Sequence, residues 1–167
     1  MDPQHDVEPY VEAAAQKSMR ITHIFETHVQ ADHLSGARRL AAATGAPVIF
    51  HKSAPVEFPH ADVEDGERHD LGNVSLSILH TPGHTPDSVS ILVTDKTRAP
   101  EPWFVLTGDT LFSGGVGRPD LIGAGVVQRG VKGRELVGHR GPERASDAIA
   151  VDVDVVVGGA GVDRRRA

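Results

Sequence analysis

Residues 27–33 read THVQADH, and the stretches TPGHT at residues 81–85 and TGDT at residues 107–110 follow them along the chain. Each stretch comes directly after a short apolar run that is typical of a buried strand, and each contains a side chain able to bind a metal ion. In layered α/β folds, the loops beyond strand ends gather at one edge of a sheet, where ligands bind. We therefore expect the three stretches to converge on one site.

Histidine and aspartate supply the metal-binding groups of these stretches. The first stretch contains His28, Asp32 and His33, the second contains His84 and the third contains Asp109. Two neutral imidazoles and one carboxylate that leave further positions open form the facial triad typical of non-haem Fe(II). The residues alone do not decide which side chains of the first stretch would bind the ion, because Asp32 is also a suitable N-cap for the helix predicted after it.

The chain around these stretches alternates short helices and short strands. We predict helices over residues 8–18, with Asp6 as the cap, and over residues 33–44, ending at Gly45. Strands are predicted at residues 21–25, 48–50, 74–79, 88–93 and 103–106, with a further short strand between the turn sequences at residues 65–66 and 72–73. This mixture of helices, strands and hairpins indicates a layered α/β domain that contains a mixed sheet.

Composition excludes several classes of protein. The 167 residues include ten His and no Cys, so a disulfide framework, a thiolate nucleophile and Cys-ligated zinc are excluded. The net charge of −6 argues against nucleic acid as a partner. No apolar run approaches the roughly 18 residues of a membrane helix, and no signal peptide is visible. We therefore expect a cytoplasmic protein that acts on a small molecule without binding a membrane, and the composition permits a homo-oligomer.

The last part of the chain differs in character from the rest. All seven aromatic residues lie at or before Phe112, whereas half of the 18 Gly fall after residue 121. Recurrent glycine and the lack of aromatic anchors argue against a packed core there. We predict one domain over residues 1–123 and a divergent, poorly ordered segment over residues 124–167.

The motifs together resemble those of a known family. Thr-His-x-x-Ala-Asp-His, Thr-Pro-Gly-His-Thr and Thr-Gly-Asp-Thr-Leu-Phe are similar to the motifs of the metallo-β-lactamase superfamily. Within it, residues 26–28 (ETH) and 117–120 (GRPD) most resemble the persulfide dioxygenase, or sulfur dioxygenase, branch. The resemblance covers about residues 2–123 and implies an αββα sandwich with the metal site at one edge, between two sheets. The first strands of the family would lie before Asp2, so we expect the sandwich to be incomplete.

The resemblance also implies roles for individual residues. His28, His84 and Asp109 would bind one Fe(II) ion per chain, and Arg118 matches an arginine near the glutathione part of the substrate. A guanidinium suits that role because it binds a carboxylate through two hydrogen bonds. The implied activity is the oxidation of a glutathione-type persulfide to sulfite by O₂.

Gln30 departs from the superfamily pattern, which has a second His at this position. Zinc hydrolases with two metals, such as glyoxalase II, use that His as a ligand, and glutamine binds zinc poorly. Asp32 and His33 would hold the second metal of such a hydrolase, whereas in a dioxygenase these residues and Gln30 would hydrogen-bond to the ligands or to bound water. The zinc hydrolase stays open as an alternative, as does an inactive, truncated remnant without turnover.

Overall fold

The structure is a computed structural model that describes residues 1–30, 33–112, 115–118, 128–132 and 135–139. These residues contain the helices α1 (Glu8–Gln16) and α2 (Ala37–Thr44) and the short 3-10 helix η1 (Gly108–Thr110). None of the helices in these ranges is long and apolar enough to span a bilayer.

The strands form a parallel sheet, a larger antiparallel sheet and two small hairpins. The parallel sheet contains β1 (Ile24–Phe25), β2 (Val48–His51) and β3 (Ala61–Val63), in that order. The antiparallel sheet contains β4 (Arg68–Leu71), β5 (Val74–His80), β6 (Val89–Asp95) and β7 (Phe104–Leu106), in that order. The hairpins pair β8 (Leu111–Phe112) with β9 (Gly115–Val116) and β10 (Gln128–Lys132) with β11 (Glu135–His139). In the described residues, parallel and antiparallel pairing therefore occur in separate sheets and not in one mixed sheet as predicted.

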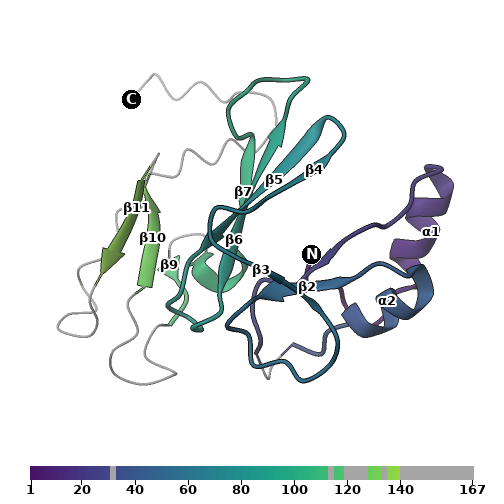
Figure 1. Ribbon diagram of the computed structural model, residues 1–167, viewed down its shortest axis with the longest axis horizontal. Coiled ribbons are helices and arrows are strands. Elements are labelled where there is room, and N and C mark those ends of the chain that lie inside the picture. The colour runs from purple at the N-terminus through teal and green to yellow at the C-terminus, as the bar shows by residue number, and fades with distance from the viewer. Residues whose placement is uncertain (31–32, 113–114, 119–127, 133–134, 140–167) are drawn as a thin grey trace, which may run out of the picture.

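The parallel sheet is buried on both of its faces. Ile24 of β1 and the residues Val48 and Phe50 of β2 pack against the helices, while Phe25 and Ile49 face the four-stranded sheet. Successive side chains of a strand point to opposite faces, so a strand buried on both sides is a continuous apolar run. Figure 1 shows α1 and α2 on the side of this sheet that faces away from the four-stranded sheet.

A second core lies between the two sheets. It contains Phe25, Ile49 and Val63 from the parallel sheet and Ile78, Val89 and Ile91 from β5 and β6. Complete burial of side chains of this size is worth about 1.5–3 kcal/mol each. The described residues thus build three layers of the predicted αββα sandwich, namely the helices, the parallel sheet and the antiparallel sheet.

The helix boundaries differ from the prediction. α1 begins after Val7 and no side chain caps it, so Asp6 is not its cap. α2 begins at Ala37 rather than at residue 33, and it ends as predicted at Gly45, where a φ of 74° is left-handed.

The late start of α2 follows from contacts of the loop before it. The N–H of Gly36 donates a hydrogen bond to the carbonyl of Pro3 (2.8 Å). A Cβ atom at position 36 would lie 2.0 Å from the carbonyl oxygen of Gln4, so only glycine allows this approach. The loop is therefore held against the N-terminal segment and reaches α2 as irregular chain.

The segment predicted to diverge is described only in part. The hairpin of β10 and β11 lies within residues 124–167. Residues 119–127, which include the predicted boundary near residue 123, lie outside the described residues, as do residues 133–134 and 140–167. The division of the chain into a domain and a divergent segment stays a prediction.

Candidate metal centre

Three loops at the ends of strands from both sheets meet at one place. His28 follows β1 of the parallel sheet, His84 lies in the loop between β5 and β6, and Asp109 lies in η1, directly after β7. The N–H of Val89 in β6 donates to the carbonyl of Thr27 (2.9 Å), which joins the first loop to the antiparallel sheet. Residues far apart in the sequence are thus brought together where the two sheets adjoin.

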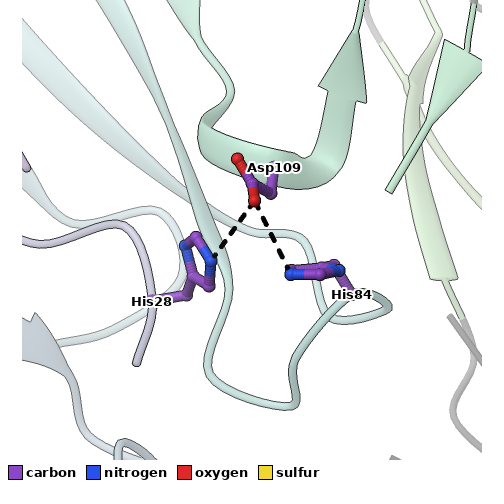
Figure 2. A group of neighbouring side chains, drawn as sticks. All are labelled: His28, His84 and Asp109. Carbon is purple, nitrogen blue, oxygen red and sulfur yellow. Dashed lines mark ion pairs between the residues drawn. The ribbon is translucent and has the colours of Figure 1, made fainter. Parts of the chain in front are cut away.

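His28, His84 and Asp109 point toward one another (Figure 2). Asp109 Oδ2 is 3.8 Å from His28 Nε2 and 3.7 Å from His84 Nε2, and the donor atoms of the three residues all lie within 4.8 Å of one another. The two imidazole rings stand at 79° to each other, so they approach the carboxylate from different directions. Donors that bind one ion at about 2.1 Å lie about 3 Å apart. A small contraction would therefore close this set of donors around a metal ion.

Gln30 lies beside both histidines. Its Oε1 atom is 2.9 Å from His28 Nε2 and 2.7 Å from His84 Nε2. The amide thus takes the space next to both ring nitrogens, at the position where the superfamily pattern has a second imidazole. Binding of an ion by both histidines requires this amide to turn or to move outward.

Hydrogen bonds orient His28 and the loop that carries it. The Thr27 hydroxyl lies 2.9 Å from His28 Nδ1, the ring nitrogen that does not face Asp109. The buried carboxylate of Asp87 accepts a hydrogen bond from the N–H of Val29 (2.8 Å). A ligand histidine commonly has its second nitrogen held in this way, which fixes the ring and leaves the other nitrogen for the metal.

Buried hydroxyl groups join the loops that carry His84 and Asp109. Thr81 Oγ1 lies 3.0 Å from Ser90 Oγ and 3.1 Å from Thr110 Oγ1, and all three side chains are buried. Each hydroxyl can both donate and accept, so Thr81 can donate to one neighbour and accept from the other without water. This contact fixes the second and third loops relative to each other.

Two glycines allow the backbone to approach the donors closely. At Gly117, a Cβ atom would lie 1.9 Å from the carbonyl oxygen of Asp109 and 3.0 Å from His84 Cβ. At Gly108, φ is +50° and a Cβ atom would lie 2.5 Å from the Thr27 hydroxyl oxygen. Both positions are therefore part of the wall of the site.

A cavity of about 430 Å³ opens beside His28, one of the three donors, and Gln30 also lines it. The buried carboxylate of Glu26 also lines it and accepts a hydrogen bond from the Ser35 hydroxyl. Burial raises the pKa of Glu26 above its usual value, and the hydrogen bond from Ser35 opposes that shift. The cavity offers space for a small molecule next to the candidate metal ligands.

The other residues predicted for the site differ in their positions. His33 is exposed and lines the cavity, and Arg118 is exposed directly after the wall residue at position 117. Asp32 lies outside the described residues. The sequence analysis assigns no role to two carboxylates that hold the first loop. Asp87 accepts a hydrogen bond from the N–H of Val29, and Asp2 accepts hydrogen bonds from Thr27. An isolated carboxylate outside a motif gives no local sign that it will make such a contact.

Comparison with known families identifies the fold. The sequence profile of the Metallo-beta-lactamase superfamily matches residues 2–159. The chain belongs to the metallo-β-lactamase superfamily. This membership confirms the predicted fold class, and the match extends beyond residue 123, where the recognisable motifs end.

The similar proteins of this superfamily include enzymes of different kinds. The hydroxyacylglutathione hydrolase of Hahella chejuensis is 35% identical over 113 residues, which are 68% of this chain and 42% of the relative. The metallo-beta-lactamase structure from Staphylococcus aureus subsp. aureus COL has a TM-score of 0.63 and 37% identity, over 72% of this chain and 38% of that chain. The structure of ETHE1 from Myxococcus xanthus has a TM-score of 0.62 and 32% identity, over 72% of this chain and 50% of that chain. This chain thus spans about two fifths to one half of the length of these relatives.

Proposed function

We propose that the protein is a mononuclear non-haem iron dioxygenase that oxidises a glutathione-type persulfide to sulfite. The observation that carries the proposal is the convergence of His28, His84 and Asp109. The resemblance of residues 26–28 and 117–120 to the persulfide dioxygenase branch supports it, and the likeness to ETHE1 fits an oxidoreductase.

The donors are chemically suited to one Fe(II) ion. Two imidazoles and one carboxylate are the ligand set of many non-haem iron oxygenases, and they leave positions free for reactants. Gln30 supplies an amide in place of the imidazole that two-metal zinc hydrolases of the superfamily use as a ligand. Iron bound by the three residues would supply the redox chemistry that activates O₂.

The remaining residues would bind and orient the substrate. Thr27 holds the His28 ring, and Gly117 lets the backbone close around Asp109. Arg118 is the candidate for a carboxylate of the substrate. In the overall reaction the outer sulfur gives four electrons to O₂, the S–S bond breaks, and O₂ and one water together supply the three oxygen atoms of sulfite. The inner sulfur leaves as the thiol, and two protons are released.

A metal-dependent thioester hydrolase is the second candidate. It is favoured by the 35% identity to a hydroxyacylglutathione hydrolase. Such an enzyme would use zinc and water and would consume no O₂. Both candidate enzymes would act on a derivative of glutathione. An assay of the reaction therefore distinguishes them, whereas a measurement of glutathione binding does not.

The test is the metal content per chain after anaerobic purification with Fe(II) and Zn(II) both offered, followed by two activity assays. One assay measures O₂ uptake and sulfite release from glutathione persulfide, and the other measures hydrolysis of S-lactoylglutathione. The variant His84→Ala is expected to lose the metal, whereas the control His139→Ala is expected to keep it.

About one iron per chain with O₂ uptake and sulfite release would support the dioxygenase. Bound zinc with thioester cleavage and no O₂ uptake would support the hydrolase and overturn the first proposal. A chain that retains no metal and turns over neither substrate would be the inactive remnant. Equal metal content in His84→Ala and His139→Ala would overturn the assignment of the ligands.

A further inference from the structure

The cavity beside His28 and Gln30 carries charged side chains that have no part in the reaction proposed above. Its volume of about 430 Å³ lies within the range of about 300–1,000 Å³ that is usual for small-molecule sites. Arg38 of α2 and residues 55–58 line it together with His28 and Gln30. Because His28 is both one of the three donors and part of the cavity wall, a molecule whose sulfur lies at the donors can extend its organic part along these walls.

Arg38 lies over an aromatic ring at the wall of the cavity. Its guanidinium carbon is 5.1 Å from the centroid of the Phe58 ring, a cation–π contact that holds the planar group in place. Arg38 is exposed, and among the described residues no carboxylate forms an ion pair with it. A guanidinium held on a ring without a carboxylate partner is well placed to bind a carboxylate of a ligand.

Arg39, the next residue of α2, does have charged and polar partners. Arg39 lies 3.9 Å from a carboxylate oxygen of Glu8 and 2.9 Å from a ring nitrogen of His5. It does not line the cavity. The two adjacent arginines, both exposed, therefore differ in surroundings and form a matched pair for an experiment.

The same cavity also offers negative charge. Glu57 is exposed on the segment 55–58 that lines it. The other carboxylate of the cavity, that of Glu26, is buried and bound by Ser35. A cavity with a free guanidinium and an exposed carboxylate matches a ligand that carries both a carboxylate and an ammonium group.

We propose that this cavity binds the zwitterionic amino-acid end of a thiol peptide of the glutathione type. Arg38 binds its carboxylate and Glu57 binds its ammonium group, while Phe50 and Phe58 contact the part of the peptide that connects the sulfur to these groups. The class of substrate rests on the proposed function. Glutathione has two carboxylates, so the assignments of Arg38 and Arg118 do not compete.

The experiment measures the binding of S-methylglutathione to the metal-loaded full chain by calorimetry. Arg38→Met keeps an unbranched apolar stem and removes the guanidinium with its charge, and the dissociation constant of this variant is expected to rise about 10-fold. Arg39→Met is the matched control and is expected to bind as the unchanged protein does. Glu57→Gln is expected to weaken binding by a smaller factor.

A second ligand, the dimethyl ester of S-methylglutathione, separates the carboxylate contact from a general effect of the substitution. The ester has no carboxylate, so Arg38→Met is expected to change its binding little. In whichever reaction the protein catalyses, Arg38→Met is expected to raise KM and leave kcat unchanged, because the contact is made equally in the ground state and the transition state.

Equal binding of S-methylglutathione by Arg38→Met and the unchanged protein would overturn this inference, as would the failure of the unchanged protein to bind it. The binding measurement needs no O₂ and no turnover. A protein that hydrolyses thioesters and still shows the Arg38 effect would refute the dioxygenase alone, and a dioxygenase without the Arg38 effect would refute this inference alone.

Discussion

The carboxylate of Asp2 accepts both hydrogen bonds that Thr27 can donate. The Thr27 N–H donates to Asp2 Oδ1 (2.7 Å) and the Thr27 hydroxyl donates to Asp2 Oδ2 (3.0 Å). Because the single hydroxyl proton points to Asp2, the Thr27 oxygen can only accept from His28 Nδ1, which is 2.9 Å away. His28 therefore carries a proton on Nδ1. The Gln30 Oε1 atom 2.9 Å from Nε2 can only accept, so Nε2 presents a lone pair to a metal once that amide has turned away. This is the tautomer that a metal ligand acting through Nε2 requires.

The substitution Asp2→Asn should weaken metal binding although Asp2 does not touch the donors. An amide cannot accept both hydrogen bonds from Thr27, so the Thr27 hydroxyl becomes free to donate to His28 Nδ1 and to favour the wrong tautomer. Loss of such an outer contact typically costs about 10- to 100-fold in metal affinity. Competition with a chelator measures the affinity, and Asp6→Asn is the matched control. Unchanged affinity in Asp2→Asn would refute the role of Asp2.

Gly117→Ala should displace Asp109 and lower metal content. The new Cβ atom would lie 1.9 Å from the Asp109 carbonyl oxygen, a contact that only a shift of the backbone can relieve. Overpacking of this kind typically costs about 1–3 kcal/mol. The control is Gly115→Ala, where a Cβ atom meets nothing within 4 Å. Gly117→Ala should bind less metal and unfold at a lower temperature than Gly115→Ala. Equal metal content and equal thermal stability would show that the close contact of residue 117 with Asp109 has no consequence.

Gln30→Ala should retain one metal ion per chain, because the amide contacts the two histidines without being one of the three proposed donors. Gln30→His should increase the uptake of zinc, since imidazole is a far better zinc ligand than an amide. Metal analysis after exposure to each metal separately measures both effects. Loss of the metal in Gln30→Ala would instead make Gln30 a ligand.

The free energy of unfolding of the metal-free protein should fall as the pH is lowered through about 6.5, the ordinary pKa of histidine. His51 of β2 is stacked on His80 of β5, with the ring centroids 3.8 Å apart. Burial lowers the pKa of His51, and charge on His80 lowers it further. Because the folded pKa lies below the unfolded one, the unfolded chain takes up the proton first as the pH falls, and the folded state loses stability.

Urea unfolding between about pH 5.5 and 8 measures this dependence around the ordinary histidine pKa. His51→Gln should make the dependence on pH less steep. It should not abolish the dependence, because burial also lowers the pKa of His23. An unchanged slope in His51→Gln would exclude His51 as a source of the acid sensitivity.

Local patterns were sufficient to predict most elements of the fold and the residues that converge. The strands β5 and β6 have a continuous or alternating apolar pattern, and each of the three motifs directly follows a strand. Such signals depend only on neighbouring residues. Whether His28, His84 and Asp109 bind a metal stays a prediction, although the structure brings their donor atoms together.

Features that depend on distant contacts could not be predicted. β3 was missed because its three residues, Ala61–Val63, are too few to show a period, and their pairing with β2 decides their conformation. The start of α2 depends on Gly36 meeting Pro3 and Gln4. The separation into two sheets likewise depends on which strands meet across the core, and neighbouring residues do not encode that choice.

The three donors come from opposite sides of the core between the sheets, His28 from the parallel sheet and His84 and Asp109 from the antiparallel one. A metal held by all three would therefore cross-link the two halves of the sandwich, in a chain that has no cysteine with which to form a disulfide. A metal that binds only the folded chain raises the free energy of unfolding by mass action. The supply of metal in the cell would then set how long the protein survives proteolysis, as well as whether it turns over its substrate.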